Sequence, residues 1–218
     1  DWTQATATAQ WGFRYDHSAV VFDNQMWVMG GYSGSADLNN VWYSTDGIDW
    51  AQATANAQWP ERSGHKSIVF DNRMWAIGGF PGFNDVWYST DGIDWTRTTI
   101  NAQWETREDH ASAVFTPPQY VASSTAMWMI GGQASGCVGV VECNDVWYST
   151  DGIDWTLTTL AAQWEARNNH SSLVFNNQMW MMGGDPDNAG TGCQTNAGCN
   201  DVWYSSDGTD WTYATAEL

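Results

Sequence analysis

Residues 41–50 read VWYSTDGIDW, and the same ten letters recur at 86–95 and 146–155. A fourth copy at 202–211, VWYSSDGTDW, differs at two positions. Self-similarity of this kind is typical of repeat architectures, in which each unit buries its apolar face against its neighbours. The sequence therefore predicts a repeat protein.

Three further motifs precede each copy in the same order. An apolar segment ends in paired glycines; before it stands an Arg-x-x-His unit, and before that an Ala-Gln-Trp triplet. Together with the copies themselves and a fifth Asp-Trp pair at Trp2, these motifs contain all 17 Trp and all 4 His of the 218 residues. We expect the excess of Trp to serve the folding of the repeat rather than one binding site.

Each unit is predicted to form four short strands. In the first unit these are residues 17–22 (HSAVVF), 26–29 (MWVM), 41–44 (VWYS) and 51–55 (AQATA), rich in β-branched and aromatic residues. An Asp-Asn pair and an Asp-Gly pair mark tight turns between them. No segment has helical apolar periodicity. Four strands in a period near 45 residues favour an all-β propeller of four-stranded antiparallel blades.

The whole chain, residues 1–218, is interpreted as one propeller domain or as a segment of a propeller. The repeat units are placed at about 2–49, 50–94, 95–154 and 155–210, with a terminal strand at 211–218. The Asp-Trp element occurs five times and the other motifs four times, so one terminal strand is spare. Three arrangements stay open: a piece of a longer propeller, a ring completed by self-association through terminal strands, or a four-bladed ring with a spare strand.

The combination of motifs resembles the Kelch repeat family. The shared elements are Arg-x-x-His, a hydrophobic strand, Gly-Gly, an aromatic pair such as Trp42 and Tyr43, and a later Trp. Residues 44–50 also look like the Asp-box of sialidase-type propellers, one residue short, and are interpreted as a hairpin turn. The resemblance implies that the Arg and His of each unit bond to backbone and stack on Trp; these structural residues are Arg14, His17, Arg62, His65, Arg107, His110, Arg167 and His170.

The formal net charge of −18 argues against nucleic acid and anionic membranes as partners. Much of this charge comes from turn aspartates that are spread over every unit. No apolar run approaches the length that a membrane-spanning helix needs, so membrane insertion is not expected.

The four cysteines lie in two equivalent pairs, Cys137 with Cys143 and Cys193 with Cys199, each six positions apart. Both pairs fall in the long loops between the second and third strands of units three and four. Zinc would favour closer spacing or a histidine ligand, so two local disulfides are predicted. Disulfides imply an oxidising compartment, and we expect an extracellular or cell-surface location.

No cofactor is expected. A weak calcium alternative rests on the oxygen-bearing side chains of Asp185, Asp187 and Asn188, but Ala189 stands where an EF-hand spacing needs a further ligand. Four histidines converging on a metal are the second alternative. No unrepeated His, Gly-x-Ser-x-Gly element or phosphate loop is present, so enzyme activity is not expected.

The candidate ligand-binding residues are four of the aromatics outside the repeated motifs, Tyr15, Tyr32, Phe80 and Phe83. They fall in loops that emerge on one face of a propeller, where recognition is common. We expect a non-enzymatic extracellular interaction or assembly module that binds another macromolecule through loops or exposed blade edges. The alternative is a lectin-like propeller that binds a glycan with the same aromatics; an enzyme domain is a distant third.

Overall fold

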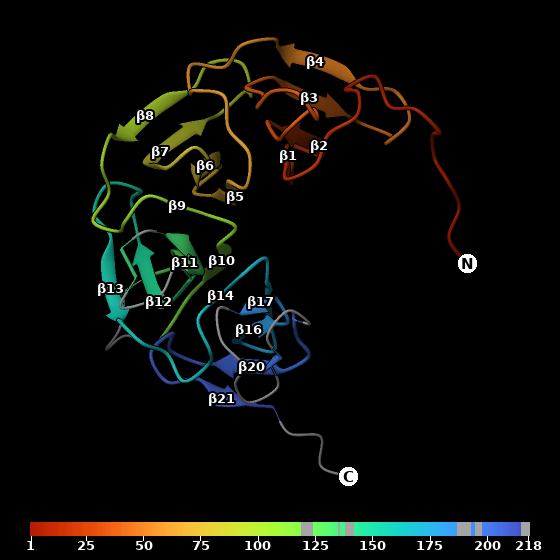
Figure 1. Cartoon of the computed structure of the whole chain (residues 1–218). Helices are drawn as coiled ribbons and strands as arrows, with labels where there is room; N and C mark the ends of the chain where they lie inside the picture. Colours follow the sequence, from red (N-terminus) through yellow and green to blue (C-terminus); the bar gives the residue numbers. More distant parts are fainter. Residues whose placement is uncertain (119–123, 135, 138–141, 187–192, 195–197, 215–218) are drawn as a thin grey trace.

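The computed structural model describes residues 1–118, 124–134, 136–137, 142–186, 193–194 and 198–214. Within these ranges the regular elements are β-strands, which form four main antiparallel sheets around one axis (Figure 1). No helix long and apolar enough to cross a membrane occurs in the described part of the chain. The protein is an all-β, four-bladed propeller, and the predicted fold class is confirmed.

Each blade pairs its strands in chain order. Blade one contains β1 (Ser18–Phe22), β2 (Gln25–Met29), β3 (Val41–Ser44) and β4 (Ala51–Thr54). Blade two contains β5 (Lys66–Phe70), β6 (Arg73–Gly79), β7 (Phe83–Ser89) and β8 (Thr96–Thr99). Blade three contains β10 (Ala111–Phe115), β11 (Ala126–Ala134), β12 (Glu142–Ser149) and β13 (Thr156–Thr159), with β9 (Arg107–Glu108) beside β11.

Blade four contains β15 (Ser171–Phe175), β16 (Gln178–Met182), β20 (Val202–Ser205) and β21 (Thr212–Tyr213). Two short pairs lie before and within its long loop: β14 (Arg167–Asn168) with β17 (Asp185–Pro186), and β18 (Cys193–Gln194) with β19 (Gly198–Cys199).

Tight turns join the third strand to the fourth in each blade, and the first strand to the second in blades one, two and four, so few residues separate these strands. Between the first and second strands of blades one, two and four, two consecutive residues have positive φ, as a type I′ turn requires. These pairs are Asp23–Asn24, Asp71–Asn72 and Asn176–Asn177. Between β3 and β4, the Gly47 N–H donates to Ser44 Oγ at 2.8 Å, and the Ile48 and Asp49 N–H groups donate to Asp46 Oδ1 at 2.8 and 3.0 Å.

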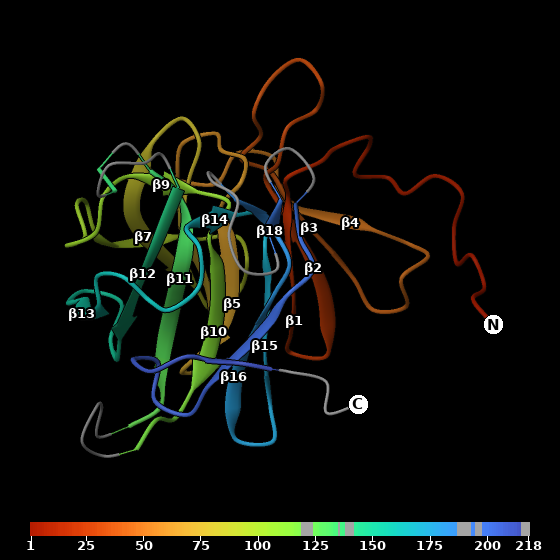
Figure 2. The ribbon, with the colours of Figure 1, turned by 60° about the horizontal axis from the view of Figure 1, so that its bottom comes forward.

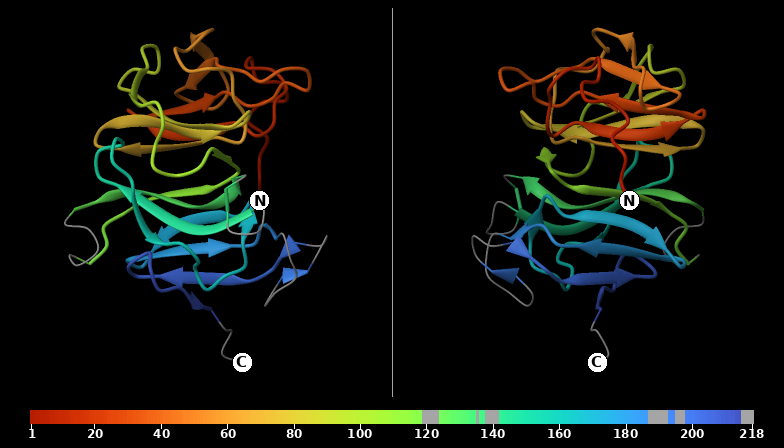
Figure 3. Two further views of the ribbon diagram at one scale, coloured as in Figure 1. Left: turned by 60° about the vertical axis from the view of Figure 1, so that its left-hand side comes forward. Right: turned by 90° about the vertical axis from the view of Figure 1, so that its right-hand side faces the viewer.

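The first strands of the blades lie next to one another around the axis, where β1 contacts β5, β5 contacts β10, and β10 contacts β15. In Figure 3 the blades follow one another in chain order from top to bottom, and Figure 2 shows the chain from a further side, with the N-terminus on the right. No comparable contact joins β15 to β1. Blades one and four are therefore the two ends of an arc of blades (Figure 1).

The hydrophobic core is divided among the three seams between successive blades. One cluster joins blades one and two around Trp27 and Trp59, a second joins blades two and three around Trp75 and Trp104, and a third joins blades three and four around Trp128. Because each blade buries its faces against its neighbours, the same side chains must recur in every unit. This packing is the physical reason for the repeated Trp.

The spare Asp-Trp copy lies at the N-terminus. Strand β21, which follows Trp211, pairs with β20 and completes blade four. Trp2 is 101% exposed and belongs to no strand. The blades also end later than the expected repeat units, because β4 (Ala51–Thr54) follows Trp50 and pairs with β3.

Candidate functional site

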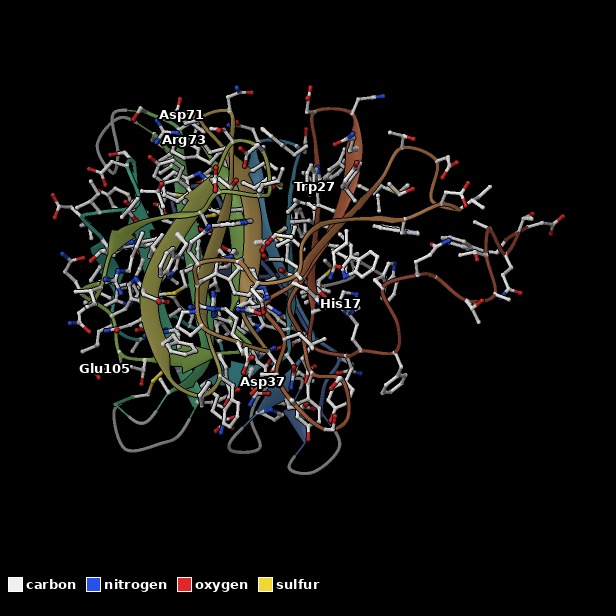
Figure 4. All side chains as sticks on the ribbon, turned by 90° about the horizontal axis from the view of Figure 1, so that it is seen from above. His17, Trp27, Asp37, Asp71, Arg73 and Glu105 are labelled. Carbon is white, nitrogen blue, oxygen red and sulfur yellow. A yellow bond between two sulfur atoms is a disulfide. The ribbon has the colours of Figure 1, made fainter. Side chains whose placement is uncertain are left out.

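The propeller presents two faces with different loops. The loop face is formed by the connections between the second and third strands and by those that lead from one blade to the next. The turn face is formed by the tight turns between the first and second and between the third and fourth strands. Figure 4 shows Asp37 and Glu105 of the loop face opposite Asp71 and Arg73 of the turn face. The loops that carry the predicted ligand-binding aromatics thus share one face.

A buried arginine supports the loop face in each of blades two to four. Arg107 donates to both carboxylate oxygens of Asp145, at 2.7 and 2.8 Å, and to the Gly131 carbonyl at 3.0 Å. Arg62 pairs in the same way with Asp85, and Arg167 with Asp201. The guanidinium carbons lie 5.7 to 6.0 Å from the ring centroids of the Trp in the preceding Ala-Gln-Trp triplet. Each of these arginines is therefore held by an ion pair with Asp, by hydrogen bonds and by stacking on a Trp ring.

Blade one lacks the aspartate. Arg14 donates instead to Asn40 Oδ1 at 2.8 Å and to the Gly30 carbonyl at 2.9 Å. In the other three blades the same aspartate also accepts the indole N–H of the Trp two positions later. The Trp42 indole N–H of blade one is buried without a hydrogen-bond partner. Burial lowers the pKa of Arg14 from its ordinary value.

Three of the four histidines, His65, His110 and His170, lie within the seams, and His17 lies on the open side of blade one. His65 and His170 each lie 5.9 Å from the Trp of their own Ala-Gln-Trp triplet, centroid to centroid. Burial lowers the pKa of His65 and His110 well below the usual value, and it lowers that of His170 to about 3. These three imidazoles are therefore neutral at physiological pH. Among the described residues, the one grouping with three metal-ligating atoms close together is Cys193, Cys199 and Asp201, and it includes no histidine.

The predicted ligand-binding aromatics have two different environments. The Tyr15 and Tyr32 rings meet edge to face at 5.3 Å on blade one, and Phe13, which sequence reasoning missed, packs on Tyr15 at 6.2 Å. Phe80 is 47% exposed. Phe83 instead covers the Arg62 guanidinium, whose carbon lies 4.4 Å from the ring centroid. Phe13 is 75% exposed and directly precedes the repeated Arg14. The one signal in the sequence was an aromatic residue at a position where the other units have Glu, Thr or Ala.

Two hollows lie at the seams of the loop face. The larger, of about 520 Å³, lies between the loops of blades three and four. Its lining includes Glu105, Glu142, Trp147, Leu160 and Glu165. The smaller, of about 240 Å³, lies between blades two and three and is lined by Phe80, Pro81, Gly82, Thr106, Arg107, Glu108, Gln133 and Ala134. Arg107 borders both hollows.

An acidic group with a displaced pKa lies near the axis at the smaller hollow. Burial, reinforced by the nearby charges of Asp109, Asp16 and Asp37, raises the pKa of Glu108 to about 7. Burial also raises the pKa of Asp109, against the attraction of Lys66. Glu108 is therefore partly protonated near neutral pH, and the charge of this part of the loop face depends on pH.

Both predicted disulfides are present in the long loops. Cys137 is bonded to Cys143, and Cys193 to Cys199. The first borders the larger hollow. Of the calcium candidates, Asp185 lies in β17, where it pairs with Asn168 of β14. Asp187 and Asn188 lie outside the described residues.

Comparison with known proteins agrees with this geometry. The family model of the Kelch motif matches residues 14–43, which run from the Arg-x-x-His unit to the aromatic pair of blade one. No curated protein matches the chain. The other three blades contain the same motifs in the same order, and their four main strands pair in the same order. The chain is a four-bladed β-propeller whose first blade matches the Kelch motif over residues 14–43.

Proposed function

We propose that the protein is a non-enzymatic, extracellular interaction module that binds a protein partner through its loop face. Kelch propellers are in general non-enzymatic scaffolds for binding proteins. The observation that carries the proposal is the pair of hollows at neighbouring seams of the loop face, with the exposed Phe80 at the edge of one. A rigid scaffold that presents concave surfaces beside an aromatic anchor is typical of recognition surfaces.

The lining of the hollows indicates the chemistry of the partner. Glu105, Glu142 and Glu165 border the larger hollow, and Glu108 borders the smaller. The charge of Arg107, which borders both, is engaged by Asp145. A partner segment with lysine or arginine next to an apolar side chain would complement this surface, because the cation meets carboxylates while the apolar group meets Phe80 or Leu160.

The disulfides support an extracellular location. Cytosolic reductants keep thiols reduced, so two disulfides that close surface loops fit a secreted or surface-displayed protein. Each bond closes a short loop next to or within the loop face. The disulfide between Cys137 and Cys143 would therefore hold these two lining residues of the larger hollow in place without a partner, which lowers the entropy lost on binding.

The experiment is a binding screen of the purified chain against arrays of extracellular proteins and of glycans. Phe80→Ala removes the aromatic anchor of the loop face. Ile93→Ala is the matched control, because Ile93 is 50% exposed, close to the 47% of Phe80, but lies in a turn of the opposite face. We expect a protein ligand whose affinity falls more than about tenfold with Phe80→Ala and is unchanged with Ile93→Ala.

A second comparison uses charge. Glu105→Gln should weaken the same protein ligand and reduce the salt dependence of its affinity, because one carboxylate is removed from the surface. A ligand that binds both variants as tightly as the parent protein would contradict the use of the loop face. Glycans that bind in a Phe80-dependent manner while no protein binds would support the lectin alternative instead.

A further inference from the structure

The three internal seams share one Trp–Gly contact. The Trp of each second strand packs on the glycine in the Asp-Gly turn of the following blade: Trp27 on Gly92, Trp75 on Gly152, and Trp128 on Gly208. A Cβ atom on these glycines would lie 2.1, 2.2 and 2.1 Å from the ring, so only glycine fits. All three Trp rings are buried.

The seams also share two sets of hydrogen bonds. The Asn two positions before the third-strand Val donates to the Ala-Gln-Trp backbone of the next blade, as Asn84 does to the Ala102 and Trp104 carbonyls at 3.4 and 3.2 Å. Near the axis, backbone N–H groups donate from blade to blade: Gly64 to Asp16 at 2.9 Å, Asp109 to Gly64 at 2.8 Å, and Asn169 to Asp109 at 3.0 Å.

Blade four contains the Trp and Asn of this contact set, but no following blade packs on them. Trp180 is held as its equivalents are: its indole N–H donates to the Phe175 carbonyl at 3.0 Å, and its ring lies 5.1 Å from that of Tyr204. Its ring is nevertheless only partly buried, and Asn200, the equivalent of Asn84, is exposed. Leu173, Val174 and Phe175 of β15 are exposed as well, and Phe175 is 66% exposed.

Blade one contains the turn glycine and the Ala-Gln-Trp triplet of this contact set, but no preceding blade packs on them. Gly47 is the equivalent of Gly92, but a Cβ there would meet only the terminal methyl and sulfur of Met26 and no Trp ring. Trp11, Trp50 and His17 are partly exposed, whereas their equivalents in the other three blades are buried. Blades one and four lie at the two ends of the arc in Figure 1.

We propose that these two ends dock on each other between copies of the chain, with Trp180 of one copy seated on Gly47 of a second copy and Asn200 donating to the Ala9 carbonyl. The second copy is the occupant because the open faces are the two halves of a seam that the same chain builds three times. Trp180 already has the orientation that the seam requires, so little entropy is lost on docking. The contact is heterologous and therefore produces closed rings or longer assemblies.

The sequence at the ends fits this arrangement. The Ala-Gln-Trp triplet of the first unit follows residues 1–7, which read DWTQATA, and a similar sequence, DWTYATA, occurs at residues 210–216. In the internal seams, a sequence of this type leads from the fourth strand into the next triplet. The proposal does not depend on the hollows of the loop face.

The test measures the mass of the chain by light scattering over a range of concentrations. We expect assemblies of at least twice the 24.3 kDa of one chain. Trp180→Ala and Gly47→Ala should each weaken assembly by more than about tenfold, as expected for a central Trp anchor. Gly82→Ala is the control for Gly47→Ala, because both glycines have positive φ and Gly82 lies in an exposed loop outside the open faces. Phe80→Ala, which alters the loop face, should leave assembly unchanged.

Mixing the two defective variants separates docking from misfolding. The Trp180→Ala chain keeps an intact Gly47 face and the Gly47→Ala chain keeps an intact Trp180 face, so the mixture should form a dimer with one contact. A parent chain that stays monomeric at its highest soluble concentration would overturn the proposal. Assemblies that both variants form as well as the parent chain does, or a mixture that does not associate, would also overturn it.

Discussion

Asp145→Asn tests whether the buried ion pairs hold the blades together. Asp145 accepts two hydrogen bonds from Arg107 and one from the Trp147 indole at 2.6 Å. The Arg107 side chain is 1% exposed, so water cannot replace a lost partner. The substitution keeps the size of the side chain, removes its charge and replaces one acceptor oxygen by a donor. Two donors, from Arg107 and Trp147, would then face an amide N–H₂ group.

The expected cost follows from this geometry. Removing one partner of a buried ion pair costs about 3–5 kcal/mol, because the remaining charge is left uncompensated. One hydrogen bond to the amide oxygen survives, as it does between Arg14 and Asn40 in blade one, so we expect the lower end, about 3 kcal/mol. Asn40→Asp makes the reverse change. It supplies Arg14 with a carboxylate and the Trp42 indole with an acceptor, and should stabilise the protein by about 1–2 kcal/mol.

Urea unfolding followed by Trp fluorescence measures both changes. We expect a lower midpoint for Asp145→Asn and a higher midpoint for Asn40→Asp, with unchanged slopes. A loss below about 1 kcal/mol for Asp145→Asn would refute the reasoning, because it would mean that the ion pair is worth no more than an exposed one. A destabilised Asn40→Asp variant would show that the seam of blade one cannot accommodate the pair.

Three further predictions concern pH and the disulfides. Glu108 has a pKa of about 7 in the folded protein against an ordinary 4.5, so its ionisation destabilises the fold as pH rises from 4.5 to 7. Above pH 7, Glu108→Gln should therefore have a higher urea midpoint than the parent protein. Equal midpoints there would contradict this prediction. In that variant, His170 has a folded pKa of about 3 against an ordinary 6.5, so its burial as a neutral group should lower the urea midpoint as pH drops below 6.5. A flat profile would count against this burial. Cys193→Ser with Cys199→Ser should lower the free energy of unfolding by about 2–3 kcal/mol, as expected for a short loop; a midpoint equal to that of the oxidised parent protein would argue against a stabilising bond.

The repeated residues made the fold predictable. A Trp at the same place in four units, next to Gly-Gly and Asp-Gly, shows the strands, their turns and the number of blades, because a propeller blade buries its faces only against other blades. The pairing of Cys193 with Cys199 was predictable for the same reason, since the pair recurs at an equivalent place in unit three.

The candidate site was less predictable, because it depends on contacts between units. Phe80 and Phe83 are three positions apart, yet one is exposed at a hollow and the other covers Arg62. Glu108 follows a repeated Arg directly, but its raised pKa comes from burial and then from the charges of Asp109, Asp16 and Asp37, which belong to two blades. Nothing in the local sequence distinguishes these environments.

The sequence by itself determined that the chain forms four similar blades, because each unit contains the same turn residues and the same spacing of buried aromatics. Only the tertiary structure decided which copy of the Asp-Trp strand is spare and which seams are filled. Trp180 and Trp128 belong to the same motif, but Trp128 packs on Gly208 and Trp180 has no blade beside it. A repeat specifies both sides of every contact, and the position of a unit in the arc determines which sides remain open.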